Sequence, residues 1–253
     1  MEALKLSVAT ILVRKTYFIW VAFLLVGTLV FPYLTPWEEK PSLLQPARAQ
    51  TAWAIAWLFV LGWGLYQAAS FGDKWAADGI LDYLKSTSRR KFARLGQLWS
   101  TSLIFLGAFV LIAFGLSLAT AMPKASTEAW MWVWTNLQYA WLFILAMGPL
   151  LLFATALGTR LNATAAYCLT AGLGIYGLFG IAYLDFFLSQ TENAFFDFLF
   201  LISPHYHLAD LSDRLVFKMG ALDTETFLHT SAYLAGLGAI ISSASYFLYR
   251  DRK

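Results

Sequence analysis

Charged residues are scarce in this sequence. Asp, Glu, Lys and Arg make up 13% of its 253 residues, whereas 59% are hydrophobic. That charged share is about half of the value usual in a soluble globular domain. The single cysteine, Cys168, lies within an apolar block, which excludes a disulfide framework within the chain and a cysteine-based metal site. The composition predicts an all-α integral membrane protein, because backbone groups in lipid must be hydrogen-bonded within helices.

Several catalytic patterns are missing. No Gly-x-x-x-x-Gly-Lys-[Ser/Thr] phosphate loop occurs, so we expect no ATP chemistry in this chain. A serine nucleophile between glycines, paired catalytic carboxylates and a His-Glu-x-x-His zinc site are equally absent. The net charge of +3 comes from basic residues beside apolar blocks, a pattern typical of membrane orientation. We therefore expect no enzyme, no catalytic residue, no cofactor in this chain and no nucleic-acid partner.

Six apolar blocks are long enough to cross a membrane. A spanning helix needs about 20 predominantly apolar residues, because the hydrocarbon core is about 30 Å thick. The blocks occupy residues 16–34, 51–69, 98–120, 131–157, 163–188 and 230–249. Since no repeat or linker separates them, the sequence predicts one transmembrane domain over residues 1–253.

Lys and Arg are unevenly divided between the two sides of the predicted spans. Residues 1–15, 70–97, 158–162 and 250–253 together carry thirteen of the 18. Because positive residues are retained on the cytoplasmic side, we expect both termini and the loop at 70–97 to be cytoplasmic. The pattern predicts a multi-pass protein of the plasma membrane, which in bacteria is the inner membrane.

Three segments outside the spans differ in the secondary structure that their sequences predict. Residues 1–15 predict an apolar helix that either lies along the inner interface or extends the first span. Residues 35–50 are expected to form no regular helix because of three prolines, Pro36, Pro41 and Pro46. Residues 189–229 contain an aromatic run followed by leucines at helical spacing. We expect two short helices at the outer interface there.

Two small motifs lie in the second half of the chain. Gly174, Gly177 and Gly180 fall on one helical face, where small residues let helices approach closely. The same stretch matches the residue pattern of a dinucleotide-binding fingerprint but not its structural context, because that fingerprint requires a strand and a polar phosphate pocket. His205 and His207 are candidates for a metal site, although ordinary interfacial histidines are the favoured interpretation.

The longest charged stretch, residues 71–97, carries six of the 18 Lys and Arg. Asp73 and Ser88 are candidate caps for two helices. The first helix would carry an apolar stripe, which needs a covering partner: Ile80, Leu81 and Leu84. An alternative is a basic loop held at anionic lipid by Arg89, Arg90, Lys91 and Arg94.

These residues and the order of the spans resemble the permease subunit of an ABC type-2 transporter. In that family the second-to-third loop reads acidic residue, Gly-Thr-Leu, a leucine-rich turn, Pro-x-Ser-Arg and Gly-Lys. Here Asp78-Gly79-Ile80-Leu81, Ser88-Arg89-Arg90 and Gly96-Gln97 stand at these places. The sequence departs from the pattern at Ile80 and Gln97, and it has no proline in the loop.

The resemblance implies a membrane subunit of an ATP-driven exporter. Two permease subunits, identical or different, would form the membrane unit, and separate ABC ATPase subunits would supply the ATP and Mg²⁺ chemistry. A coupling helix at about 78–84, together with Arg89 and Arg90, would dock into the ATPase. Gly174, Gly177 and Gly180 would lie near the contact between permeases. The alternative is a stand-alone membrane protein, namely a secondary transporter, a membrane enzyme or a structural anchor of a complex.

Overall fold

The computed structural model describes residues 2–34, 41–87, 90–190 and 193–250, without the side chains of 2, 3, 41–43, 84, 86 and 87. Every regular element in this part of the chain is a helix. Six helices are long and apolar enough to cross a membrane: Thr16–Leu34, Leu44–Ala77, Lys91–Ala121, Ser126–Gly158, Ala163–Gln190 and Thr224–Leu248. The predicted all-α class and the six candidate spans are confirmed.

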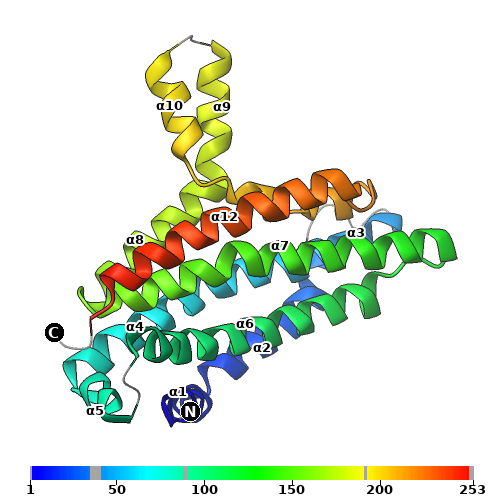
Figure 1. The fold of residues 1–253 in the computed structure, drawn as a ribbon. Helices are drawn as coiled ribbons and strands as arrows, with labels where there is room; N and C mark the ends of the chain where they lie inside the picture. The colour runs from blue at the N-terminus through cyan, green and yellow to red at the C-terminus, as the bar shows by residue number, and fades with distance from the viewer. Residues whose placement is uncertain (1, 35–40, 88–89, 191–192, 251–253) are drawn as a thin grey trace.

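The elements follow one another with short connections (Figure 1). Before the third span they are α1 (Glu2–Arg14), α2 (Thr16–Val30), the 3₁₀ helix η1 (Phe31–Leu34), α3 (Pro41–Leu58), the π-helix η3 (Phe59–Gly64), α4 (Leu65–Ala77) and α5 (Ile80–Thr87). The rest are α6 (Lys91–Ala121), α7 (Ser126–Gly158), α8 (Ala163–Ile175), the π-helix η4 (Tyr176–Gly180), α9 (Ile181–Gln190), α10 (Ala194–Ile202), the 3₁₀ helix η5 (Tyr206–Ala209), α11 (Ser212–Val216) and α12 (Thr224–Leu248).

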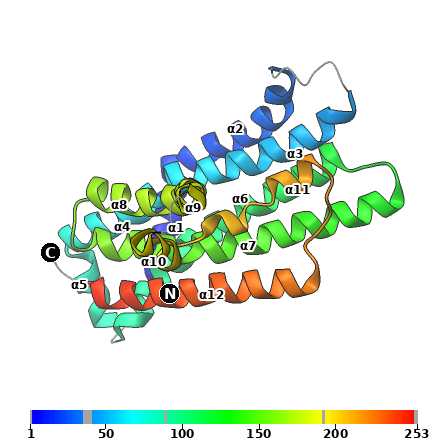
Figure 2. The same ribbon diagram turned by 90° about the horizontal axis from the view of Figure 1, so that it is seen from above.

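Helix α7 lies at the centre of the bundle. It packs against α4, α6, α8 and α12, and these helices run largely side by side in Figures 1 and 2. In the spans Leu44–Ala77 and Ser126–Gly158, 67% of the most apolar 18-residue stretch is buried inside the protein. In the other four spans the corresponding share is 22–33%. The second and fourth spans therefore form the protein core, and the others are left to face lipid or a partner.

The first two helices are separate elements. Lys15 has a φ of 58°, the left-handed conformation that breaks a helix, and α1 turns away from α2 at this point (Figure 1). Helix α1 then lies against α6, where the Ser7 and Thr101 hydroxyls are 2.5 Å apart. This break excludes the alternative in which residues 1–15 simply extend the first span.

The prediction that residues 35–50 form no regular helix is wrong for residues 41–50. Helix α3 begins at Pro41 and contains Pro46. A proline is tolerated at the first helical position, where its missing N–H would have no partner. Pro46 removes one backbone hydrogen bond in the second turn, and the packing of α3 against α6 compensates for that loss. Pro36 lies outside the described residues.

The fifth span bends at η4. Helix α9 leaves the bundle there and forms a hairpin with α10, which stands away from the body (Figure 1). Figure 2 views this hairpin end-on, whereas α7 and α12 lie lengthwise. The chain then returns to the bundle as η5 and α11, which pack against α7 and α3. Short helices thus occur where residues 189–229 predicted them, but their arrangement differs: one stands in the hairpin and the other is packed on the bundle.

Candidate functional site: the α5 end of the bundle

Helix α5 is joined to α4 by a glycine turn. Asp78 is the C-cap of α4 and donates its N–H to the Lys74 carbonyl at 2.8 Å. Gly79 follows with a φ of 70°, a left-handed conformation that glycine adopts without steric cost. The predicted coupling helix therefore begins at Ile80, not at Asp78. We call the region where α5, the end of α4 and the start of α6 gather the α5 end.

The expected apolar stripe on α5 is largely covered within the chain. Leu81 is fully buried and Ile80 is half-buried, because α5 folds back against α4 and α6. Leu81 therefore needs no external partner, contrary to the expectation, whereas Ile80 keeps part of its surface exposed. The exposed aromatic side chain on α5 is Tyr83, which is 69% exposed. The side chain of Leu84 lies outside the described part of the structure.

The basic residues after α5 have different environments. Arg90 is the exposed N-cap of α6, without a side-chain capping bond. Arg94 is only 3% exposed, so it does not face anionic lipid as the basic-loop alternative required. Lys91 places its ammonium 4.8 Å from the Tyr246 ring centroid on α12. Ser88 and Arg89 lie outside the described residues.

Two glycines bring α4 and α7 into backbone contact. A Cβ atom on Gly72 would lie 2.1 Å from the Thr155 carbonyl oxygen, and one on Gly158 would lie 2.2 Å from the Ala69 carbonyl oxygen. Any side chain at either position would force the helices apart, since ordinary contact begins at 3.4 Å. The helix that carries α5 is thus packed directly on the central helix.

Asp73 links α4 to the start of α8. Its carboxylate accepts the Ala163 N–H at 2.8 Å, at the positive end of α8. Asn162 accepts the Ala165 N–H at 2.7 Å in the same turn. The prediction that Asp73 caps a helix of its own segment is wrong, because α4 continues through it to Ala77. Its partner lies 90 residues further along the chain.

The loop between α7 and α8 also holds the end of α12. Thr159 accepts the Arg250 N–H at 2.9 Å. Arg160 donates to the carbonyl oxygens of Leu248 and Phe247, the latter at 3.0 Å. The two bonds from Arg160 satisfy carbonyls that the end of α12 would otherwise leave unpaired. Together with Asp73, they tie α4, α8 and α12 to one short loop at the α5 end.

A second polar cluster lies deeper in the bundle, between α3, α6 and α7. The fully buried Asn136 amide accepts from the Trp53 indole N–H at 2.9 Å and from the Ser117 hydroxyl at 2.7 Å. One turn further, the Tyr139 hydroxyl accepts from Trp57 at 2.9 Å and donates to Asp210 at 2.5 Å. This cluster fixes the returning segment that contains η5 and α11 against the core.

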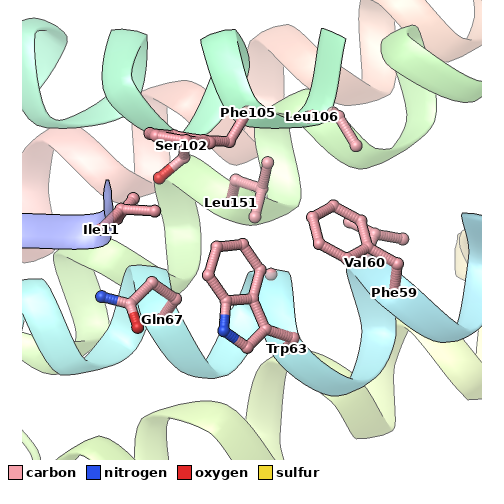
Figure 3. Close-up of a pocket in the computed structure, with 10 residues that line it drawn as sticks. Ile11, Phe59, Val60, Trp63, Gln67, Ser102, Phe105, Leu106 and Leu151 are labelled. Carbon is pink, nitrogen blue, oxygen red and sulfur yellow. The ribbon is translucent and has the colours of Figure 1, made fainter. Parts of the chain in front are cut away.

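A small cavity lies in the core between α3–α4 and α6. Its volume is about 10 Å³, enough for about one water molecule. Gln67 and Ser102 are the polar side chains among the residues that line it (Figure 3). The Gln67 Nε2 atom is buried and has no hydrogen-bond partner in the described part of the chain. This cavity is too small to be a preformed path for a cargo.

The predicted glycine face of the fifth span lies against other parts of the same chain. A Cβ on Gly174 would be 3.0 Å from Leu61, and one on Gly177 would be 2.5 Å from the Pro204 carbonyl oxygen. Gly180 is covered by the ring of Tyr176. Gly174 and Gly177 thus lie in close contact with neighbouring segments, and this face is occupied within the chain.

The two candidate metal ligands, His205 and His207, contact other groups of the chain. His205 Nε2 lies 3.0 Å from the Phe200 carbonyl oxygen, and its ring centroid is 5.5 Å from that of His207. Among the described residues, no group of three His, Cys, Asp or Glu side chains is placed to hold a metal ion. The geometry gives these histidines a packing role at the base of the α9–α10 hairpin.

Sequence reasoning missed Gly72 and Gly158, although the signal was present: Gly64, Ala68, Gly72 and Ala76 recur every four residues, and Ala154 precedes Gly158 by four. A comparison of the chain with protein-family models, curated proteins and solved structures finds no match.

Proposed function

We propose that this protein is a membrane-spanning permease subunit of an ATP-driven exporter and that a separate ABC ATPase docks at its α5 end. The observation that carries the proposal is the close packing that connects α5, through α4, to the central helix α7. Helix α5 follows α4 after a single glycine turn, and α4 is packed on α7 through Gly72 and Gly158. A displacement of α5 would therefore be passed to the central helix.

The hydrogen bonds of the α7–α8 loop extend this connection. Asp73 joins α4 to α8, while Thr159 and Arg160 join the same loop to the end of α12. Three of the six candidate spans thus meet close to the docking helix. An anchor protein would not require such a junction, whereas a subunit driven from outside the membrane does. This difference favours the exporter over a structural anchor.

In this proposal the α5 end is cytoplasmic and the chain lies in the plasma membrane. The distribution of Lys and Arg supports the orientation, with both termini on the same side as α5. The ATP and Mg²⁺ chemistry belongs to the ATPase. The contact surface in this proposal includes Tyr83, Asp78 and Arg90, which are all exposed.

A second permease subunit is also part of the proposal. The α9–α10 hairpin stands away from the bundle, and none of the side chains of α10 is buried (Figure 1). Its exposed apolar residues include Phe195, Phe198 and Leu201. Asp185 and Asp197 are exposed on the same hairpin, and carboxylates in lipid are costly. Since the glycine face is occupied within the chain, we assign the contact between subunits to this hairpin.

The test is whether an ATPase co-purifies with this chain from native membranes. The permease is expected to co-purify with a separate protein that is labelled by azido-ATP. Tyr83→Asp should remove that protein, because it places a charge on the exposed aromatic surface of α5. Phe217→Asp is the matched control, since Phe217 is 71% exposed but lies between α11 and α12, away from α5. Purification of the native chain without any ATPase would contradict the proposal.

A further inference from the structure

A cleft lies between the first half of α7 and the beginning of α12. Its volume is about 770 Å³, within the range of about 300–1000 Å³ that is typical of ligand pockets. Helix α7 contributes Met131, Trp134 and Trp141, and the other wall contains Leu222 and Leu228. The N-terminal half of α7 and the start of α12 lie at the end of the bundle opposite α5 (Figure 1).

Apart from Thr224, the polar side chains that line the cleft are hydrogen-bonded to other groups of the cleft. The Gln138 side chain donates to the Leu222 carbonyl oxygen at 3.0 Å and accepts the Leu222 N–H at 2.7 Å. The Trp141 indole N–H donates to the Ser231 hydroxyl at 3.3 Å. The surface left for an occupant is therefore aromatic and aliphatic. Trp134, Trp141 and Leu228 are 44%, 52% and 58% exposed, which predicts an apolar occupant.

The length of the cleft matches one leaflet of a bilayer. Met131 and Trp141 are ten residues apart on α7, which corresponds to about 15 Å of helix. This is about half of the 30 Å hydrocarbon core. Trp130 and Trp134 lie near the start of α7, at a position suited to the membrane interface. A hydrocarbon chain that entered beside them would extend along the cleft to the middle of the membrane.

An ion pair stands at the mouth of the cleft. Glu128 precedes Met131 by one helical turn and lies on the same face of α7. The Lys218 ammonium is 3.6 Å from the Glu128 carboxylate, with the two side chains 42% and 46% exposed. Arg214 fixes the intervening loop through the carbonyl oxygens of Gly220 and Ala221, at 3.1 and 3.2 Å. One cation and one anion are thus held side by side with hydrogen-bonding capacity left over.

We propose that this cleft binds a membrane phospholipid with a zwitterionic head group. One acyl chain lies along Met131, Trp134 and Trp141, the phosphate binds Lys218, and the head-group ammonium binds Glu128. The charge pattern at the mouth complements a zwitterion better than an anionic lipid such as phosphatidylglycerol, because the anionic lipid brings no ammonium group to pair with the Glu128 carboxylate. This site is independent of the proposed docking at the α5 end.

Native mass spectrometry of the delipidated full chain in detergent tests the proposal. The chain is titrated with phosphatidylethanolamine and, in parallel, with phosphatidylglycerol. We expect one phosphatidylethanolamine per chain and weaker binding of phosphatidylglycerol. Leu228→Trp, which fills the cleft, should weaken binding at least about tenfold. Ile240→Trp is the matched control, because Ile240 is 69% exposed on the same helix but does not line the cleft, and its binding should be unchanged.

Two surface variants test the head-group contacts without altering the lining. Lys218→Ala should weaken both lipids by about two- to fivefold, the range expected for an exposed charge pair. Glu128→Ala should weaken phosphatidylethanolamine alone and so remove the preference between the two lipids. Equal binding of both lipids by the native chain would overturn the proposal. Equal binding by Leu228→Trp and Ile240→Trp, with both variants retaining native helicity, would also overturn it.

Discussion

Replacement of Gly72 by alanine tests the contact between α4 and α7. The new Cβ would lie 2.1 Å from the Thr155 carbonyl oxygen, whereas ordinary contact begins at 3.4 Å. The backbone oxygen cannot rotate away as a flexible side chain would, so the helices must separate by about 1 Å. Overpacking of this kind costs about 1–3 kcal/mol. Alanine offsets about 0.5–1 kcal/mol of this cost, because it stabilises a helix more than glycine does.

Because the clash is with a backbone atom, the cost lies in the upper part of that range, about 2–3 kcal/mol, which leaves a net loss of about 1–2 kcal/mol in the free energy of unfolding. For a chain of this length, that corresponds to a fall in melting temperature of about 2–8 °C. Thermal unfolding in detergent, followed by near-ultraviolet circular dichroism, measures the change. Gly107→Ala is the matched control, since a Cβ on Gly107 in α6 meets no atom within 4 Å. Its melting temperature should be unchanged or higher, and equal melting of the two variants would refute the close contact.

Two other contacts give measurable outcomes. Asp73→Ala removes the acceptor of the Ala163 N–H. We expect the free energy of unfolding to fall by about 0.5–2 kcal/mol and amide exchange at the start of α8 to become faster. Unchanged exchange there would argue against the link. Hydrogen bonds from Thr226 lower the pKa of Asp223, the N-cap of α12. The ionised carboxylate therefore stabilises α12 fully above the ordinary pKa of Asp. This stabilisation is lost as the pH falls through the lowered pKa. Amide exchange at residues 224–227 should rise over that acid range in the native chain, whereas Asp223→Asn should show no such pH dependence; the same rise in the variant would assign the change to another group.

The spans could be predicted from the sequence because lipid imposes a simple rule: an apolar block of sufficient length must be helical. The same rule does not determine how the helices meet. Asp73 resembled a local cap, and only the folded chain brings it to Ala163. Leu81 belonged to a stripe that predicted an external partner, but α5 turns back at Gly79 and buries it against its neighbours.

Proline and glycine patterns were informative in part. Pro41 and Pro46 predicted a loop, but a proline at a helix start costs little and packing offsets the second one. Gly174 and Gly177 predicted a close contact, and in the structure both lie against other segments of the chain. Their partners could not be predicted, because Pro204 reaches Gly177 only after the chain has left and re-entered the bundle. Contacts of this kind depend on the path of the whole chain.

Photo-crosslinking from α5 tests the central proposal most directly. A benzoylphenylalanine placed at position 83, where Tyr83 is 69% exposed, should crosslink to the nucleotide-binding subunit in native membranes. The same group at position 217, which is 71% exposed, should give no such product, because it directly follows α11, which lies far from α5 along the bundle (Figure 2). An ATPase crosslinked at position 83 alone is the predicted result. No ATPase product at position 83, or equal products at both positions, would contradict docking at the α5 end.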